Sequence, residues 1–345
     1  MKVHAILRSE ATVGALTGRV LCHDVRDRAD TVVGRKGERL DRAGAERVLG
    51  GDWDELHLLE LELGDLHEEE AGARLSQAVV GDGVQVKGFS GGQWSLTATR
   101  RGLLRVNAEP LCQVNVCEGI SVFTLFHGQP VEAGEVVAKA KITPLAIASA
   151  TMMEVERLAR GAGVLAVTPF KSLTLGALAR ESLDDKQRQR FETALREKID
   201  WFGSRLLPIR YAGRSVQSVA KELEGLRDEG ADLLIVAGAS ALDPLDPVFS
   251  ALELVGGRME RHGAPAHPGS LLWISRWGQR QVVGMPACGM FSQATTFDLV
   301  LPRILAGEAM GNAEIAALGH GGLLSREMAF RFPRYRPSAP RGELE

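Results

Sequence analysis

The sequence is poor in cysteine, and this excludes one class of small secreted protein. Its 345 residues contain 4 cysteines, which form no CxxC pair: Cys22, Cys112, Cys117 and Cys288. Such scattered cysteines give no disulfide framework. We therefore expect reduced thiols, as in cytoplasmic proteins.

Long apolar runs and a charge excess of one sign are also missing. No run approaches the length of a membrane span, and the apolar stretch after Met1 is too short for a secretory signal. The formal net charge of −3 provides no basic excess for nucleic-acid binding. With 45% hydrophobic and 25% charged residues, the composition is that of a soluble globular protein. The prediction is a cytoplasmic protein without a membrane or nucleic-acid partner.

The length implies more than one domain, and the front part is predicted to be rich in strands. We expect residues 1–142 to form a β-rich accessory region of one or two small domains. Alternating residues over 94–99 and 103–106, with Arg100-Arg101-Gly102 between them, predict a hairpin. The other predicted elements are strands over 13–25, 31–40, 121–125 and 131–142, and a helix over 68–80.

The pattern changes at Thr143-Pro144, where a threonine cap and a proline at the first helical position predict a helix that Gly161 ends. Strands and helices then alternate, which indicates a mostly parallel sheet with helices on both faces. We predict an α/β domain over 143–310, followed by a C-terminal extension and tail over 311–345. The expected strands are 164–168, 205–211, 232–237, 271–275 and 281–284, and the expected helices are 184–202, 215–228, 246–255 and one around 297–305.

The stretch 231–247 carries the strongest functional signal. A buried strand runs into a loop of small residues, which include Gly238, Ala239 and Ser240. In open α/β sheets, ligands bind in loops at the carboxyl ends of strands. Small residues let a bound group approach the backbone N–H groups, and the next helix adds its positive end. The loop is therefore predicted to hold a polar, phosphorylated ligand.

Two aspartates complete this loop. Asp243 and Asp246, three residues apart, are compatible with a Mg²⁺ site that keeps several waters. In the alternative interpretation, Asp246 simply caps the helix that Pro247 begins. If the protein is an enzyme, these two carboxylates are its predicted catalytic groups.

A second loop follows the predicted strand 164–168, which we take as the first of the α/β domain. Lys171 would pair with a phosphate, and Thr168 and Ser172 would donate hydroxyl hydrogen bonds. A solvated loop lysine is the alternative.

Two further loops contain Pro268-Gly269 and Pro286-Ala287-Cys288-Gly289. The backbone amides of the latter are predicted to cradle an anion. A helix N-terminus would lower the pKa of the Cys288 thiol. No histidine lies nearby in the sequence to act as its base, so a structural or ligand-facing thiol is favoured.

Taken together, these loops resemble those of the molybdopterin-binding domain of molybdenum-cofactor biosynthesis proteins. That family has a GGxSxGxxD-type loop, then a PGxP-type loop, then an LPGNP-type loop before a final helix. The counterparts are Ala237 to Asp243 with Asp246, Pro268-Gly269-Ser270, and Met285 to Gly289, and the resemblance extends from Ala162 to about Glu308.

The departures from the family pattern point to a divergent branch. Ala237 replaces the first glycine, Cys288 replaces the asparagine, and no acidic residue follows the strand taken as the first. The resemblance implies binding of molybdopterin or of a nucleotide form of the molybdenum cofactor, for its biosynthesis, maturation or delivery. The alternatives are Mg²⁺-dependent molybdate insertion by a molybdopterin molybdotransferase, and a nucleotide pyrophosphatase that shares the domain.

The resemblance also implies ligands and partners. Molybdopterin or molybdenum cofactor is the expected ligand, with Mg²⁺ as an added ion. The expected partners are a pterin phosphate and a molybdoenzyme or nucleotidyltransferase. A homo-oligomer is expected, because this family often builds its sites near subunit interfaces.

Overall fold

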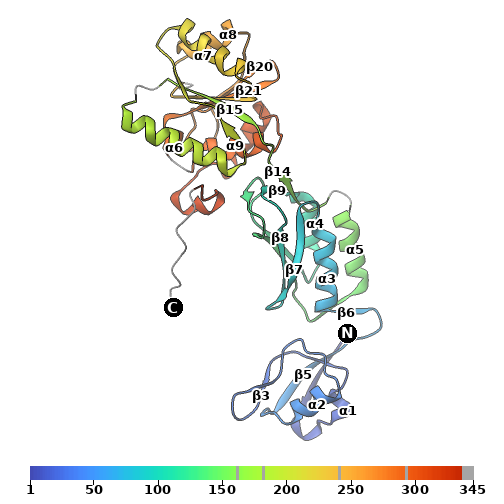
Figure 1. Cartoon of the computed structure of the whole chain (residues 1–345). Coiled ribbons are helices and arrows are strands. Elements are labelled where there is room, and N and C mark those ends of the chain that lie inside the picture. The colour runs from blue at the N-terminus through green and yellow to red at the C-terminus, as the bar shows by residue number, and fades with distance from the viewer. Residues whose placement is uncertain (161–162, 181–182, 240–241, 292–293, 336–345) are drawn as a thin grey trace. The chain divides into compact units, whose positions relative to one another are not determined.

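The computed structural model describes residues 1–160, 163–180, 183–239, 242–291 and 294–335. Figure 1 follows the chain from its blue N-terminus to its red C-terminus. Two compact units divide it: the first comprises residues 1–100, 105–127 and 133–167, and the second comprises 101–104, 128–132 and 168–345. The first unit thus extends beyond residue 142, where the β-rich region was expected to end.

The first unit begins with a small sheet of order β1-β5-β2. Leu16, Leu21, Leu56 and Leu58 are among the residues that fill its core. The strand predicted over 13–25 is wrong at its start, because the Thr12 hydroxyl accepts a hydrogen bond from Ala15 N (3.1 Å) and caps a helical turn. The elements here are β1 Lys2–Leu7, a 3-10 turn Arg8–Glu10, α1 Val13–Leu16, β2 Val20–Leu21, β3 Val25–Arg26, β4 Val32–Gly34, α2 Arg42–Leu49 and β5 Glu55–Glu60.

The rest of the first unit is a four-stranded sheet of order β10-β12-β8-β7, with α3 packed against β8 and β12. The predicted helix over 68–80 is confirmed as α3. The predicted hairpin is wrong, because its strands, β8 and β9 (Gly102–Val106), lie in different sheets. The elements are β6 Asp65–His67, α3 Glu68–Val79, β7 Val84–Ser90, β8 Gln93–Ala98, α4 Ala108–Val116, β10 Ile120–Thr124, β12 Val136–Ile142, β13 Ala146–Ala148 and α5 Ser149–Arg160.

The helix predicted to open at Thr143-Pro144 starts later. Residues 146–148 form β13, which pairs with β6 in antiparallel register. Because these three residues are held by a partner strand some 80 positions earlier in the chain, nearly one turn of the expected helix becomes strand. Helix α5 therefore begins at Ser149.

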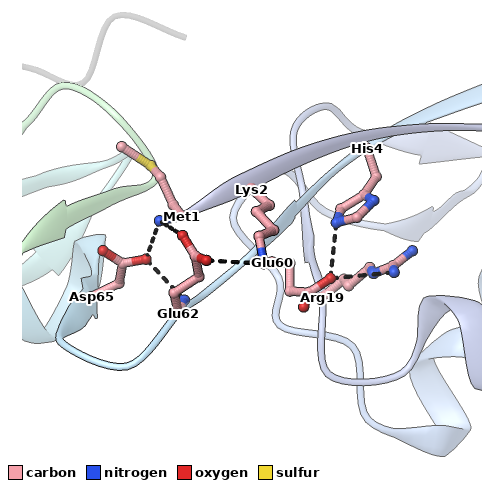
Figure 2. A network of polar contacts seen from close by, with 7 residues as sticks. All are labelled: Met1, Lys2, His4, Arg19, Glu60, Glu62 and Asp65. Atoms are coloured by element: carbon pink, nitrogen blue, oxygen red, sulfur yellow. Dashed lines mark hydrogen bonds and ion pairs between the residues drawn. The ribbon is translucent and has the colours of Figure 1, made fainter.

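A network of charged side chains lies at the surface of the first unit (Figure 2). Glu60, at the end of β5, lies 2.8 Å from His4 Nε2 and 3.3 Å from an Arg19 nitrogen. The amino group of Met1 lies 2.6 Å from Asp65, and its hydrogen bond lowers the pKa of the Asp65 carboxyl. Solvent screens such exposed pairs, so they add little to stability.

The second unit is built on a seven-stranded sheet of order β16-β15-β18-β21-β20-β19, in which β17 also pairs with β15. Four neighbouring strands of this sheet, β16, β15, β18 and β21, are parallel. Strand β20 pairs with β21, and β19 pairs with β20, in antiparallel register. Its elements are β15 Thr174–Ala179, α6 Asp185–Trp201, β16 Arg205–Leu206, β17 Arg210–Tyr211, α7 Val216–Asp228, β18 Leu233–Ala237, α8 Pro247–Leu254, β19 Arg258–His262, β20 Trp273–Trp277, β21 Arg280–Met285, 3-10 turn Ala287–Met290, α9 Thr296–Leu305, α10 Asn312–Ala316, and 3-10 turns Ala317–Gly319 and Arg326–Arg331.

Helices cover both faces of this sheet (Figure 1). Alternate residues of β18 separate the two cores: Leu233 and Ile235 pack with α6 and α9, whereas Leu234 and Val236 pack with α7 and α8. The predicted fold class, a mostly parallel α/β sheet preceded by a β-rich region, is confirmed. In the part of the chain that the structure describes, no helix is both long and apolar enough to cross a bilayer.

The strand taken from the sequence as the first of the α/β sheet belongs elsewhere. This strand, β14 (Leu165–Pro169), lies in a three-stranded sheet of order β11-β9-β14, where β11 is Pro130–Val131. The seven-stranded sheet instead starts along the chain with β15, which the sequence did not predict. A Cβ on Gly176 of β15 would lie 3.0 Å from Leu234 and 3.1 Å from Ala231 and Leu226. This tight packing explains a strand of small residues that have little strand propensity.

Candidate functional site

The parallel register brings three loops to one edge of the sheet. Ala179 pairs with Ala237, and Ala237 pairs with Met285, at the carboxyl ends of β15, β18 and β21. The segments that follow these strands therefore start side by side, at the edge where open α/β sheets bind ligands. We call this the strand-end edge.

The start of the loop after β18 is held in place by Trp273 of β20. Gly238 has φ +85°, a conformation that favours glycine. The carbonyl of buried Ala239 accepts a hydrogen bond from Trp273 Nε1 at 2.9 Å. Trp273 lies across Gly284 of the neighbouring strand, where a Cβ would come within 2.1 Å of the indole. The predicted Ser240 lies outside the described residues.

The two aspartates of this loop make local hydrogen bonds. Asp243 Oδ1 accepts from Leu245 N at 2.9 Å, and Asp246 Oδ1 accepts from Val248 N at 2.9 Å. Asp246 is thus the N-cap of α8, with Pro247 in the first turn. The described residues contain no group of three or more His, Cys, Asp or Glu side chains that could hold a metal ion.

The cation at this edge was not predicted from the sequence. Arg180 directly follows β15, and its side chain is 12% exposed. Its guanidinium lies 3.5 Å from Asp246 Oδ1 and donates to the Gly213 carbonyl at 3.0 Å. Its buried Nε has no hydrogen-bond partner among the described residues. A strand prediction over 174–179 would have identified Arg180, because it would have placed this residue at a strand end.

The loop with Thr168, Lys171 and Ser172 lies at the other end of the sheet. Thr168 is within β14, and the other two precede the start of β15. The backbone N of Lys171 donates to the carbonyl of Leu305, the last residue of α9, at 2.7 Å. A cation is favourable at this negative helix end. The structure therefore does not bring Thr168, Lys171 and Ser172 together with Gly238.

Pro268-Gly269 packs on the start of α9. The Thr296 backbone N donates to the Pro268 carbonyl at 2.9 Å, and the Thr296 hydroxyl is 3.1 Å from the same oxygen. Gly269 has φ +109°, and a Cβ there would lie 2.9 Å from the Thr296 hydroxyl oxygen. The glycine is thus required by close packing against α9.

The loop after β21 forms a short 3-10 turn. Pro286 precedes the turn, and its carbonyl accepts from Gly289 N at 2.8 Å; Ala287 and Cys288 are exposed between them. Desolvation of the sulfur raises the pKa of the Cys288 thiol, although backbone N–H groups act in the opposite direction. The expected lowering of its pKa is therefore wrong.

A buried polar cluster lies beside this loop. Asp298 of α9 accepts hydrogen bonds from Thr295 N at 3.0 Å and from the Thr295 hydroxyl at 2.9 Å. Its other oxygen accepts from Lys198 of α6 at 2.5 Å and from the Tyr335 hydroxyl at 3.2 Å. Burial, followed by the Asp298 charge, raises the pKa of Tyr335 well above its usual value. The sequence offers no sign of this cluster, because its members are far apart along the chain.

No sequence model of a known family matches this chain, and no curated protein matches it in sequence. Among solved structures, the chain is similar to a molybdopterin biosynthesis MoeA protein from Pyrococcus horikosii, at 12% identity over 88% of this chain and 75% of that chain, with a TM-score of 0.31. It is also similar to the molybdopterin biosynthesis enzyme MoaB from Thermus thermophilus, at 16% identity over 39% of this chain and 98% of that one, with a TM-score of 0.29.

A third similar structure is the molybdopterin biosynthesis Mog protein from Mycobacterium ulcerans, at 15% identity over 39% of this chain and 94% of that one, with a TM-score of 0.28. TM-scores this low do not assign the chain to a family. The function is therefore inferred from the residues of the strand-end edge.

Proposed function

We propose that this protein binds molybdopterin, or a nucleotide form of the molybdenum cofactor, and serves the biosynthesis, maturation or delivery of that cofactor. The phosphate end of the ligand would meet Arg180, next to the loop that starts at Gly238 and Ala239. The observation that carries the proposal is Arg180 itself: a largely buried guanidinium at the strand-end edge whose Nε has no partner among the described residues.

The chemistry of arginine supports an anionic ligand at this place. A guanidinium presents its N–H groups as a planar fork that matches two oxygens of a phosphate. The carbonyl of Gly213 and the carboxylate of Asp246 already fix the other nitrogens of Arg180. The guanidinium is therefore held in place with one N–H group, at Nε, that has no partner among the described residues, and little side-chain entropy is lost when an anion binds.

The two aspartates favour binding over Mg²⁺-dependent catalysis, because their carboxylates already accept hydrogen bonds. Asp243 and Asp246 each accept a backbone N–H, and Asp246 also faces Arg180. A magnesium site on these carboxylates would have to compete with both the helix cap and the guanidinium. This favours a binder over a molybdotransferase or a nucleotide pyrophosphatase.

The test is purification from a host that makes the cofactor, followed by mass spectrometry of the bound small molecules. Arg180→Gln should lower the affinity for the recovered pterin phosphate about ten- to hundredfold, because one charged hydrogen bond contributes about 1.5–3 kcal/mol. Arg196→Gln, an exposed site on α6, is the matched control. Lys171→Gln should retain the ligand.

Two results would contradict the proposal. If wild-type protein carries no pterin phosphate, the ligand class is wrong. If Lys171→Gln loses the ligand and Arg180→Gln keeps it, the sequence-based grouping is right and the site lies at the opposite end of the sheet. Turnover of adenylylated molybdopterin with molybdate and Mg²⁺ would favour the molybdotransferase.

A further inference from the structure

The four-stranded sheet of the first unit has one face that packs against helices. Trp94 of β8 pairs with Ala140 of β12, and a Cβ on Gly72 of α3 would lie 2.5 Å from Trp94 Nε1, so these residues mark the helix side. Successive side chains of a strand point to opposite faces of the sheet. Lys139 and Lys141, on either side of Ala140, therefore lie on the other face, which we call the open sheet face.

The strand register places an aromatic ring and two hydroxyl groups beside these lysines. Lys139 pairs with Phe123 of β10 on one side and with Ser95 of β8 on the other, and Lys141 pairs with Ser121 of β10. Residues that are directly paired in antiparallel strands share a face. Phe123 is 47% exposed, and the other four residues are partly exposed. The open sheet face is therefore accessible to a partner.

The charge on this sheet is of one sign. The four strands lie entirely within the described residues, and they contain Lys87, Lys139 and Lys141 but no acidic residue. Lys139 forms no ion pair with a carboxylate in the described part of the chain. Lys141 also lines a hollow that contains Glu68 and Glu69 of α3, so its charge is partly balanced. The open sheet face therefore favours an anionic partner, and Lys139 is its main cation.

The edge of the sheet beside this face is closed to strand addition at its middle. The Asn115 side chain of α4 donates to the Val122 carbonyl at 2.9 Å and accepts from the Val122 backbone N at 2.7 Å. The Ile120 backbone N also donates, to the Cys117 carbonyl at 3.1 Å. These bonds occupy backbone groups of β10 that an added strand would use. A partner is therefore expected to lie on the face of the sheet, where side chains recognise it.

The aromatic residues of the strands decide between two kinds of anionic polymer. Single-stranded nucleic acid stacks successive bases on aromatic side chains. Phe89 of β7 pairs with Trp94, so both rings lie on the helix side, and Phe123 is the single aromatic residue that these described strands present on the open sheet face. An acidic peptide needs one apolar contact and cations for its carboxylates, which Phe123 and the lysines provide. The composition of the face thus favours a peptide.

We propose that the open sheet face docks an extended acidic segment of a partner protein. Acidic side chains at alternate positions of the segment meet Lys139 and Lys141, and an apolar side chain packs on Phe123. Alternate residues of an extended chain repeat at roughly 6.6 Å, which is also the spacing of alternate residues along β12. The face belongs to the first unit and Arg180 to the second, so this inference does not depend on the proposed function.

A fluorescein-labelled peptide of eight residues tests the proposal by fluorescence anisotropy with the full-length protein. Its even positions are Glu, Glu, Phe and Glu and its odd positions are Ser, so the acidic and aromatic side chains share one face of the extended peptide. The peptide should bind at low salt and more weakly in about 0.5 M NaCl. Lys139→Gln should weaken binding about three- to tenfold, as should Phe123→Ser, and Lys139→Gln with Lys141→Gln should weaken it further.

Lys221→Gln, at an exposed site on α7, is the charge-matched control and should bind like the wild type. Arg180→Gln should also leave peptide binding unchanged, which separates this test from that of the pterin site. The proposal is overturned if a peptide with Gln in place of each Glu binds as tightly as the acidic one. It is also overturned if the double lysine variant folds normally and binds like the wild type, or if an oligothymidylate of eight nucleotides binds more tightly than the acidic peptide.

Discussion

Each face of the second unit's sheet carries a pair formed by an aspartate and a cation, and the two pairs have different roles. On each face an aspartate sits at the N-terminus of a helix and meets a cation from an earlier element. Asp246 caps α8 and faces Arg180 at 3.5 Å, whereas Asp298 holds the start of α9 and pairs with Lys198 at 2.5 Å. The first pair has side chains 12% and 13% exposed, and the second has side chains 4% and 0% exposed.

The difference lies in how completely each pair is satisfied. Asp298 accepts hydrogen bonds from Lys198, Tyr335 and Thr295, so its charge is compensated on all sides. Arg180 retains a buried Nε without a partner among the described residues. A buried ion pair whose polar groups are all hydrogen-bonded stabilises the fold. A pair at a strand end that leaves one N–H group without a partner can still donate a hydrogen bond to a ligand.

Breaking the Lys198–Asp298 pair should have the largest effect. Asp298→Ala leaves the Lys198 ammonium buried without a counter-charge and removes the anchor of α9. Loss of one partner of a buried pair typically costs about 3–5 kcal/mol. Urea unfolding followed by circular dichroism should show this loss as a lower midpoint.

A second variant separates loss of the pair from loss of packing. In Lys198→Met with Asp298→Asn, no charge is left unpaired, so most of the lost stability should return. If the double variant is as unstable as Asp298→Ala, the ion pair is not what holds α6 to α9.

The contrast between the two faces also shows what the sequence could predict. The helices α6, α7 and α8 were all expected, because their apolar positions recur with helical spacing and capping side chains precede them. Asp184 and Gln187 form a reciprocal capping box, and Ser215 caps α7. The strand β18 and its glycine loop were also expected from a local pattern, a run of apolar residues that ends in small ones.

What the sequence could not supply was sheet membership. The strand β14 is apolar enough to belong to the α/β sheet, yet it pairs with β9. The strand β15 has a single β-branched residue, Thr174, and Gly176 packs tightly against its neighbours. Choosing β14 as the first strand placed Lys171 at the ligand edge and left Arg180 unnoticed. The Lys198–Asp298 pair spans 100 positions, beyond any local pattern.

Removing the charge of Asp246 should lower the stability by less than Asp298→Ala does, and it should raise the affinity for the ligand. Asp246→Ala loses the cap of α8, which costs about 1 kcal/mol. Asp246→Ser keeps a capping oxygen and should lose less. Both variants remove a negative charge that lies 3.5 Å from the Arg180 guanidinium and repels an anion, whereas the Gly213 carbonyl still holds the side chain. Affinity for the phosphate ligand recovered with the wild type should therefore rise. Thermal unfolding and calorimetric titration measure the two quantities.

Asp246→Ser is the more informative of the two variants, because it removes the negative charge and keeps an oxygen that can cap α8. A fall in affinity with an unchanged unfolding temperature would mean that Asp246 contacts the ligand or a magnesium ion. In that case, the magnesium-dependent enzyme becomes the better hypothesis.

Alkaline pH should weaken the α6 face, and we expect this effect to be the smallest. Burial raises the pKa of Tyr211 to about 12, and burial with the Asp298 charge raises the pKa of Tyr335 well above its usual value. Both are bonded to carboxylates of that face, Glu192 and Asp298. A raised pKa in the folded state gives stability that is complete below the unfolded value near 10 and is lost as pH rises through the folded value. The urea midpoint of the wild type should therefore fall above about pH 10. The fall with pH should be less steep in Tyr335→Phe, and least steep in the double variant Tyr211→Phe with Tyr335→Phe. An equal slope in all three proteins would show that neither tyrosine is held protonated by the fold.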